Sequence, residues 1–394
     1  MIVCYYIFME SLYDQALKLH KKFRGKMEIH SRVPLNNSRD LALAYTPGVA
    51  AVCRMIARDG KSANLYTVKR NAVAIVTDGS AVLGLGNIGP LAALPVMEGK
   101  AILHKKFADV DAFPLCLATQ DVEQIIATVK NIAPAFGAIQ LEDISAPRCF
   151  AIERRLRAEL DIPVLHDDQH CTAVVVLAGL INACSVPIYG HPRLPINRRA
   201  TAKIIISGAG AAGLGITRLL LAAGFKNLII MDSKDALYRG RKDLTGEKKL
   251  ITRLTNHKKI SGTLADCLVG ADIFVGVSKA GILKPQMIKQ MNPKPIIFAL
   301  SNPIPEIMPA LAKKAGAFII ATGRNDFENQ INNVLVFPGL FRGALDNHVR
   351  MITDGMLIKA AHNLAALVKH PTPQKILPSL FDKKVAKTIA KTIK

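Results

Sequence analysis

The sequence predicts a two-domain α/β protein built on parallel sheets, and three observations carry this prediction. The chain has 394 residues, more than one hydrophobic core usually organises. Short β-rich runs alternate with helix-length segments, which is typical of parallel βαβ units. The alternation starts again after a Pro-rich connection from Pro187 to Pro195. We therefore expect an N-terminal α/β domain at residues 1–186 and a second domain at residues 187–394.

The first sixty residues read as helices broken by turns. An amphipathic run spans Leu12 to Phe23, and turn signals follow at Pro34 and at Pro47 and Gly48. Strands are then expected at Val73–Val76, Phe113–Ala118, Ala138–Leu141 and Pro163–His166. Helices are expected at Asp121–Ala133, Ala146–Leu160 and Thr172–Ala183.

The second domain is expected to be a doubly wound, Rossmann-like fold. Six strands with intervening helices suit that architecture. We predict them at Lys203–Ser207, Leu228–Met231, Ile273–Val277, Ile296–Leu300, Phe318–Ala321 and Val334–Phe337. The helices from Asp346 onward are expected to pack back across both domains.

Cysteine usage indicates a reducing compartment, and hydropathy indicates a chain without a membrane span. The seven cysteines form no C-x-x-C pair and read as reduced thiols. The longest apolar stretch after the N-terminus, Thr172 to Ala183, is shorter than the roughly 18 residues of a membrane span. Residues Met1 to Phe8 lack a basic n-region and do not read as a signal peptide. We expect a cytoplasmic protein with no membrane partner.

The net charge of +22 raises a different function class, because basic proteins attract nucleic acids. Basic residues concentrate between Arg239 and Lys249, and again in the tail at Lys383, Lys384, Lys387, Lys391 and Lys394. The tail spacing makes one helical stripe without interleaved aromatic residues, which favours a solvated helix face over a nucleic-acid site. A basic nucleic-acid-binding protein on a Rossmann scaffold stays as an alternative that a binding assay across a salt series would decide.

A glycine-rich turn opens the second domain and predicts a dinucleotide site. Gly208, Gly210 and Gly213 directly follow a β run and begin an apolar helix, so a pyrophosphate could sit on the helix N-terminus. The next strand ends on Asp232, nineteen residues after Gly213, where an acid would bind the adenine ribose hydroxyls and favour NAD. Lys234 leaves NADP possible, since a cation there could accept a 2′-phosphate.

A second G-x-G-x-x-G match, at Gly84, Gly86 and Gly89, is interpreted differently. Pro90 follows it at once, and the next acids, Asp109 and Asp111, precede a strand instead of ending one. We interpret it as a tight loop near the substrate.

Two acidic pairs follow predicted strands. Glu142 and Asp143 come after AIQL, and Asp167 and Asp168 come after PVLH. Strand C-termini open into the ligand crevice of such sheets, and carboxylate oxygens suit Mg²⁺ or Mn²⁺ better than zinc. The alternative is that these acids only cap the helices that follow, and spacing alone does not separate the two.

Several ordered motifs make nearly the whole chain resemble the malic enzyme family. They are YTPGVA, VTDGSAVLGLGNIG, EGKAIL, LEDISAP, HDDQHCTA, GAGAAG, LSNP and NNVLVFPG. The resemblance implies oxidation and decarboxylation of (S)-malate to pyruvate and CO₂, with NAD or NADP as oxidant and Mg²⁺ or Mn²⁺ bound. It also implies a homodimer.

The resemblance assigns roles to individual residues. Lys100 would be the base for the C2 hydroxyl and must then be neutral, which burial and neighbouring cations can arrange. Asp167 would orient groups or relay protons, and Tyr45, which could reach a partner's site, would protonate the enolpyruvate at C3. The metal ligands would be Glu142, Asp143 and Asp168. Asn302 would contact cofactor and substrate, and Asn333 would contact substrate.

Two departures from the family pattern affect the site. Ala81 stands where larger malic enzymes have an arginine for the substrate carboxylate, so another cation must do that work. Cys171 stands where the family usually has glycine in DDQHGTA, which affects local geometry and sensitivity to oxidation. The nearest rival activity is a malolactic-type reaction that releases lactate without net cofactor turnover.

Overall fold

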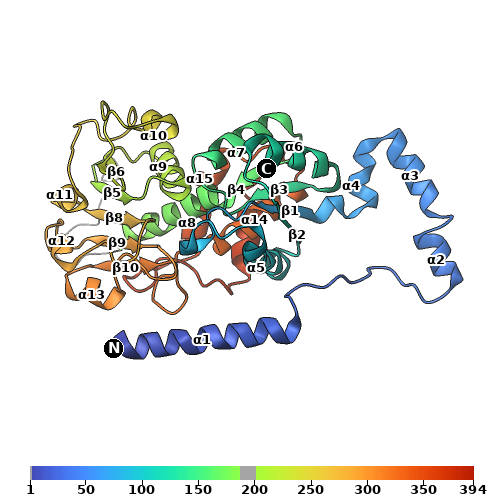
Figure 1. Ribbon diagram of the computed structural model, residues 1–394, viewed down its shortest axis with the longest axis horizontal. Coiled ribbons are helices and arrows are strands. Elements are labelled where there is room, and N and C mark those ends of the chain that lie inside the picture. The colour runs from blue at the N-terminus through green and yellow to red at the C-terminus, as the bar shows by residue number, and fades with distance from the viewer. Residues whose placement is uncertain (1, 187–200) are drawn as a thin grey trace.

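The computed structural model describes residues 2–186 and 201–394, with side chains described from residue 11 on. Two separate sheets organise these residues, as expected (Figure 1). The first sheet has the order β2-β1-β3-β4, and all its pairings are parallel. Its strands are β1 (Ala72–Thr77), β2 (Asp111–Cys116), β3 (Ala138–Leu141) and β4 (Val164–His166). Each one overlaps a predicted strand.

Helices connect and cover the strands of this sheet. They are α5 (Pro90–Ala108), α6 (Val122–Ile132), α7 (Arg148–Glu159) and α8 (Asp167–Ala183). Short 3₁₀ turns lie at Gly60–Ser62, Val68–Asn71, Leu83–Leu85 and Ala133–Ala135. Asp121, predicted as the first residue of this helix, caps α6 instead by accepting a hydrogen bond from the Gln124 N–H, which is a common role of Asp at a helix N-terminus.

The second sheet is doubly wound, with the order β10-β9-β8-β5-β6-β7. Its strands are β5 (Ile204–Ser207), β6 (Leu228–Asp232), β7 (Asp235–Ala236), β8 (Ile273–Gly276), β9 (Ile296–Ala299) and β10 (Ile319–Thr322). Its helices are α9 (Ala211–Ala222), α10 (Gly246–Ile251), α11 (Leu264–Leu268), α12 (Pro285–Lys289) and α13 (Pro309–Lys314). The strand order reverses beside β5, and this switch point is where such sheets bind ligands.

Two details of the second sheet differ from the prediction. The two-residue strand β7 pairs antiparallel with β6 and was not expected. The predicted strand Val334–Phe337 is wrong, because a 3₁₀ turn, η6 (Asn333–Leu335), leads there into α14 (Phe337–Asp346). A short buried apolar run has no periodicity that separates strand from helix. Pro338 near the start of α14 suits a helix N-terminus.

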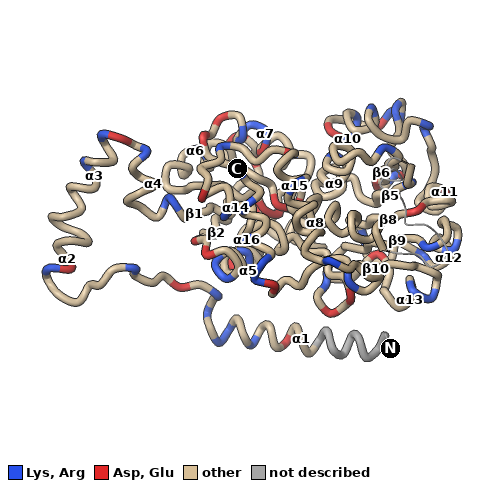
Figure 2. The backbone as a smooth tube through the Cα atoms, turned by 180° about the vertical axis from the view of Figure 1, so that it is seen from behind, with Lys and Arg blue, Asp and Glu red and all other residues tan. Residues whose placement is uncertain are grey.

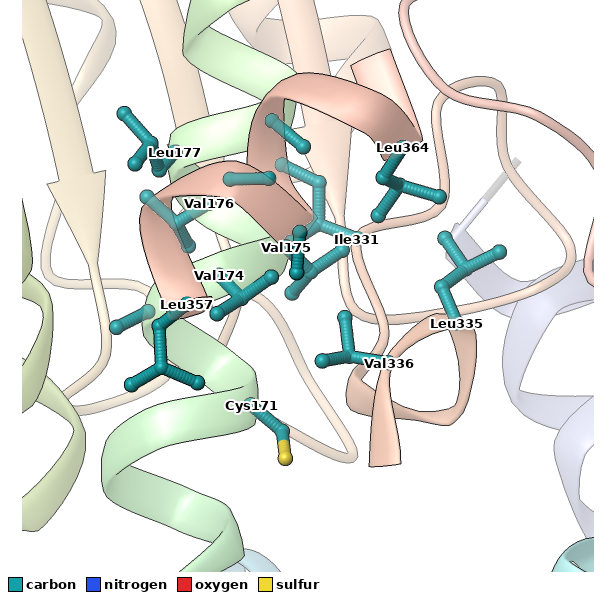
Figure 3. Packing of buried hydrophobic residues seen from close by; sticks show 14 of the residues in the cluster. Cys171, Val174, Val175, Val176, Leu177, Ile331, Leu335, Val336, Leu357 and Leu364 are labelled. Atoms are coloured by element: carbon teal, nitrogen blue, oxygen red, sulfur yellow. The ribbon is translucent and has the colours of Figure 1, made fainter. Parts of the chain in front are cut away.

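The largest hydrophobic core surrounds α8, which lies between the two sheets (Figure 1). Figure 3 shows Val174 to Leu177 of α8 packed against Val336 and against Leu357 and Leu364 of α15 (Asp354–Ala366). The same apolar cluster includes Val73 of the first sheet and Ile206 of the second. The C-terminal segment, which ends with α16 (Lys384–Ala390), therefore packs across both sheets, as expected.

The N-terminal segment extends away from this body. It contains α1 (Ile2–Phe23), α2 (Ser38–Ala44), α3 (Val49–Arg58) and α4 (Ala63–Tyr66) (Figure 1). We call residues 11–66 the arm. No residue of α2, α3 or α4 is buried. Apolar side chains along the arm are exposed as well, such as Leu17 of α1 and Leu43 of α2, which are about 70% exposed.

One segment of the arm, Ser38–Arg58, is long and apolar enough by composition to cross a membrane. The chain does not form one continuous helix there, because α2 ends at Ala44 and α3 begins at Val49. Neither helix alone has the roughly 20 residues that span a bilayer.

Candidate functional site

The two predicted acidic pairs lie side by side at one edge of the first sheet. Leu141 at the end of β3 is in register with His166 at the end of β4, so the residues that follow both strands emerge together. One carboxylate oxygen from each of Glu142, Asp167 and Asp168 lies within 4.8 Å of the other two. Spacing in the sequence predicted this meeting of two strand ends.

Lys100 of α5 points into the acidic group. Its Nζ lies 2.5 Å from Asp167 Oδ2 and 3.0 Å from Glu142 Oε1. Burial acts to lower the pKa of Lys100, but Asp167 and Glu142 outweigh burial and raise it. The expectation of a neutral lysine beside cations is therefore wrong for this state, because the neighbours are carboxylates and the ammonium is stabilised.

Asp167 is the common partner of two predicted site residues, Lys100 and Asn333. Asn333 Nδ2 donates to the same Oδ2 atom that Lys100 approaches. The ring of Phe337 lies against Lys100, with its centroid 4.7 Å from Nζ. The turn η6 and the start of α14, where a strand was predicted, thus bring the Asn333 amide to Asp167 and the Phe337 ring to Lys100.

Asp143 lies beside this group in a left-handed backbone position, with φ of 52°, and is not among the three acids whose oxygens lie within 4.8 Å of one another. Its N–H donates to Asp168 Oδ2 at 3.0 Å, and its carbonyl accepts from the Ala81 N–H at 2.9 Å. Burial, and then Asp168, raise the pKa of the Asp143 carboxyl to about 8. Four crowded carboxyl groups with low exposure would be costly without a compensating cation.

Two oxygen atoms of this group fit the test for a bound cation. Asp143 Oδ2 and Asp167 Oδ1 are buried and have no hydrogen-bond partner among the described residues. Buried polar atoms normally have a hydrogen-bond partner, so these two oxygens indicate a bound cation that oxygen atoms coordinate. An all-carboxylate set suits a hard divalent cation such as Mg²⁺ or Mn²⁺. The alternative that the acids of HDD cap α8 fails, because its first residues Asp167 and Asp168 direct their side chains to Lys100, Asn333 and the Asp143 N–H.

Glu153 supports the HDDQH segment from behind and was not predicted. This buried carboxylate on α7 accepts from the His166 N–H at 3.1 Å and from Gln169 Nε2 at 3.0 Å. It also lies 2.7 Å from His170 Nε2. Burial alone would raise the pKa of Glu153, but His170 and His166 outweigh it and lower the pKa to about 2. A single buried acid in an otherwise charged helix carries no distinctive sequence pattern.

A second supporting chain reaches Glu142 from α5 and was also missed. Gln140 Nε2 donates to Glu142 Oε2 at 2.6 Å, and Gln140 Oε1 lies 2.6 Å from His104 Nε2. Burial lowers the pKa of His104 to about 4, so the ring is neutral at pH 7. Because Gln140 Oε1 can only accept, His104 Nε2 carries the proton. The ring also packs against Phe337, at a centroid distance of 4.7 Å.

The predicted cofactor loop borders a cavity of about 800 Å³. Gly208 has φ of 123°, and a Cβ on Gly213 would lie 1.8 Å from Gly208 O. Gly210 faces open space, so a ligand can approach its backbone closely. These are the three roles that glycine has in a dinucleotide turn. The cavity also reaches Ala146 and Pro147, close after Asp143 in the chain.

Asp232 ends β6 and lines the same cavity, as predicted. Its carboxylate is already engaged, since Arg241 Nη2 donates to both oxygens at 2.8 and 2.9 Å and Lys248 Nζ donates at 2.9 Å. Burial acts against the charged form, but Lys248 and Arg241 keep the pKa of Asp232 below its usual value. The Lys234 ammonium, which could have accepted a 2′-phosphate, lies 3.5 Å from Asp243 Oδ2.

The second glycine-rich loop lies apart from that cavity and packs on Asn302. A Cβ on Gly84 would lie 2.0 Å from Asn302 O, and one on Gly323 would lie 2.7 Å from Asn302 Nδ2. Gly84, Gly86 and Gly89 do not line the 800 Å³ cavity. This supports the interpretation of the motif as a tight loop and not as a second dinucleotide turn; its place near the substrate stays a prediction.

Two predicted features have different surroundings from the rest of the site. Tyr45 lies in the arm at the end of α2 and is 64% exposed, so a single chain does not bring it to the acidic group (Figure 1). Cys171 is fully buried in the α8 core, as Figure 3 shows. Burial, and then Asp167, raise the pKa of the Cys171 thiol, which therefore stays protonated and is shielded from oxidants.

Comparison with known proteins identifies one enzyme family over most of the chain. The family model for the malic enzyme N-terminal domain matches residues 24–157, and the model for the malic enzyme NAD binding domain matches residues 170–394. The bifunctional malic/malolactic enzyme of Bacillus subtilis is 50% identical, over 97% of this chain and 92% of that protein. The NAD-dependent malic enzyme of Geobacillus stearothermophilus is 51% identical, over 96% and 78%. The crystal structure of the NAD-dependent malic enzyme of Thermotoga maritima has 48% identity and a TM-score of 0.89, covering 96% of this chain and 98% of that one.

Proposed function

Because this chain belongs to the malic enzyme family, we propose that it oxidises (S)-malate to pyruvate and CO₂ with NAD as the oxidant and NADP as the alternative. The observation that carries the proposal is the joint placement of Lys100 and Asp167. A lysine that can accept the hydroxyl proton lies 2.5 Å from a carboxylate, inside a group of acids that can hold a divalent cation.

Glu142, Asp143 and Asp168 hold Mg²⁺ or Mn²⁺ in this proposal, and Asp167 stays available for Lys100. Such a cation supplies Lewis acidity that polarises the C2 oxygen and stabilises negative charge. The buried Asp143 Oδ2, which has no hydrogen-bond partner among the described residues, supports a cation at this place. The carboxylates also raise the pKa of Lys100, and positive charge among them opposes that effect, which the role as base requires.

Asn333 and Asn302 orient the reactants. Asn333 donates to Asp167, which fixes the carboxylate that faces Lys100, and its amide leaves an oxygen free to accept from a substrate hydroxyl. Asn302 packs closely against Gly84 and Gly323 and follows the end of β9 in the second sheet.

The chain works as a homodimer in this proposal, with Tyr45 acting as proton donor in the partner's site. Two observations support it. The arm carries many exposed apolar side chains, which is unusual for a surface without a partner. Tyr45 lies far along this arm, away from the acids of its own chain.

Residues 1–186 form the catalytic domain and residues 187–394 the dinucleotide-binding domain in this proposal. The boundary itself falls outside the described residues. NAD binds in the 800 Å³ cavity with its pyrophosphate at the start of α9 and its adenine ribose at Asp232. We place the enzyme in the cytoplasm.

A malolactic reaction is the second candidate, because the Bacillus subtilis relative is named for both activities. The deciding experiment follows reduced nicotinamide by absorbance after addition of malate, Mn²⁺ and either NAD or NADP, with pyruvate and lactate assayed afterwards. Pyruvate in step with NADH, lost in Lys100→Ala, supports oxidative decarboxylation. Lactate without NADH supports the malolactic reaction, and no product with either cofactor contradicts both.

A further inference from the structure

A basic groove of about 600 Å³ lies where α5, α14 and α16 meet. The C-terminal end of α5, the C-terminal end of α14 and one face of α16 line it. Figure 2 shows the backbones of these three helices next to one another. We call it the α5/α16 groove. Its charged lining residues come from parts of the chain almost 300 residues apart, from Lys105 in α5 to Lys394 after α16.

The two acids of the α5/α16 groove are already neutralised by other lining residues. Lys105 Nζ lies 2.5 Å from Asp109 Oδ1, and Arg342 Nη2 lies 2.6 Å from Asp346 Oδ1. The remaining lysines have no ion pair with any described residue, and they are Lys106, Lys383, Lys387, Lys391 and Lys394. The groove therefore presents an excess of positive charge that the described chain does not compensate.

The fold holds these lysines toward the groove. Val385 and Ile389 of α16 are buried, and α14 accepts them closely because it has glycine at the contact. A Cβ on Gly339 would lie 2.7 Å from Ala386 O, and one on Gly343 would lie 2.4 Å from Ala390 O. With this face of α16 fixed against α14, Lys383, Lys387 and Lys391 follow at four-residue spacing along another face, where like charges repel one another.

An aromatic pair adjoins the lysines. Phe107 lines the groove, and its ring lies 6.0 Å from the ring of Phe381. Phe381 is 78% exposed, so one face of the pair is open for stacking. Clustered ammonium groups beside an exposed ring suit a ligand with several phosphates, with or without a base.

We propose that the α5/α16 groove binds a small polyphosphate-bearing anion, with Lys106 on one wall and Lys387 and Lys391 on the other. A bridging polyanion removes the repulsion within α16 and ties α16 to α5. The site is distinct from the cofactor cavity, since the two share no lining residue.

Calorimetric titration of the full chain with inorganic tripolyphosphate tests the proposal. Saturating NAD keeps the probe out of the cofactor cavity, divalent cations are left out because polyphosphates chelate them, and the ionic strength is held constant. The expected result is saturable binding of one tripolyphosphate per chain. Lys387→Glu with Lys391→Glu, and separately Lys106→Glu, should each weaken binding by roughly tenfold or more.

The matched control is Lys369→Glu with Lys384→Glu, which makes the same change in net charge with exposed lysines outside the groove. This control should bind like the unaltered chain, and all variants should retain NAD reduction by malate, which shows that they are folded. A second titration with a nucleoside triphosphate identifies the source of the phosphates. Tighter binding that Phe381→Ala abolishes assigns a nucleotide, and equal binding assigns the polyphosphate alone.

Three results would overturn the proposal. They are the absence of saturable binding, an equal loss of affinity in the control pair, which indicates bulk charge, and undiminished binding in both groove variants.

Discussion

Lys100 Nζ lies 2.5 Å from Asp167 Oδ2. This ion pair connects the middle of α5, which carries Lys100, to the residue directly after β4, which is Asp167. The same carboxylate accepts from Asn333. A proton taken up by Lys100 is therefore held between groups from three separate parts of the chain, and the protonation state of the lysine depends on all of them.

Asp167→Asn should lower kcat by about 10²- to 10⁴-fold, the usual range for a lost proton-handling group. The substitution keeps the size of the side chain and removes the charge that raises the pKa of Lys100. The acidic limb of the pH–rate profile should therefore move to lower pH. Steady-state kinetics over a pH series measure both effects, and an unchanged limb with normal kcat would exclude the coupling.

Mn²⁺ should raise the apparent melting temperature of the chain, because the acidic group binds it only when folded. At a concentration 100 times the Kd, the stabilisation is about 2.7 kcal/mol. Asp143→Asn should remove most of it by taking one of the buried oxygens. Asp161→Asn, at a carboxylate whose side chain is 95% exposed, is the control and should retain the full shift. Equal shifts in both variants would place the cation elsewhere.

Glu153→Gln should destabilise the protein by about 1–3 kcal/mol, since it leaves buried donors of the HDDQH segment poorly paired. It should also weaken Mn²⁺ binding, because Asp168 belongs to the segment that Glu153 holds. Denaturant unfolding and Mn²⁺ titration measure these effects. The control, Glu159→Gln on the same helix, alters surface pairs with Lys130 and Arg155 and should destabilise the protein much less than Glu153→Gln.

Asp232→Ser should shift the preference from NAD toward NADP by roughly tenfold or more in relative kcat/KM. The change removes a carboxylate that would repel a 2′-phosphate, and it releases Arg241 and Lys248 to bind that phosphate. Adding Lys248→Ala should cancel part of the gain. If Asp232→Ser leaves the ratio of the two cofactors unchanged, Asp232 does not select between them.

His104 should make the protein less stable as the pH falls from about 6.5 to about 4. Burial lowers the pKa of the folded-state imidazole to about 4, so the unfolded chain takes up a proton first in this window and is favoured by up to about 3 kcal/mol. The penalty is absent above pH 6.5. His104→Leu should flatten this part of the stability curve, whereas His257→Leu at an exposed position should not. Parallel curves for all three proteins would contradict the assignment.

Local patterns in the sequence were sufficient for most strands and for the cofactor loop. The β-rich run Ala138–Leu141 was predicted to the residue, and Gly208, Gly210 and Gly213 have the roles that their spacing implied. Both acidic pairs were placed correctly at strand ends. These features depend on neighbours in the chain, or on the fact that the carboxyl ends of parallel strands lie at the same edge of a sheet. Short segments therefore contain the necessary information.

Only the tertiary structure decided which groups surround each side chain. It made Lys100 a neighbour of Glu142 and Asp167 and so reversed its expected charge. It turned Val334–Phe337 from a strand into a turn and a helix, and it placed Glu153 behind the acids. It also set the solvated lysine stripe of α16 opposite Lys106. The charge state, burial and partners of a side chain depend on residues far away in sequence, and one linear pattern does not record those distances.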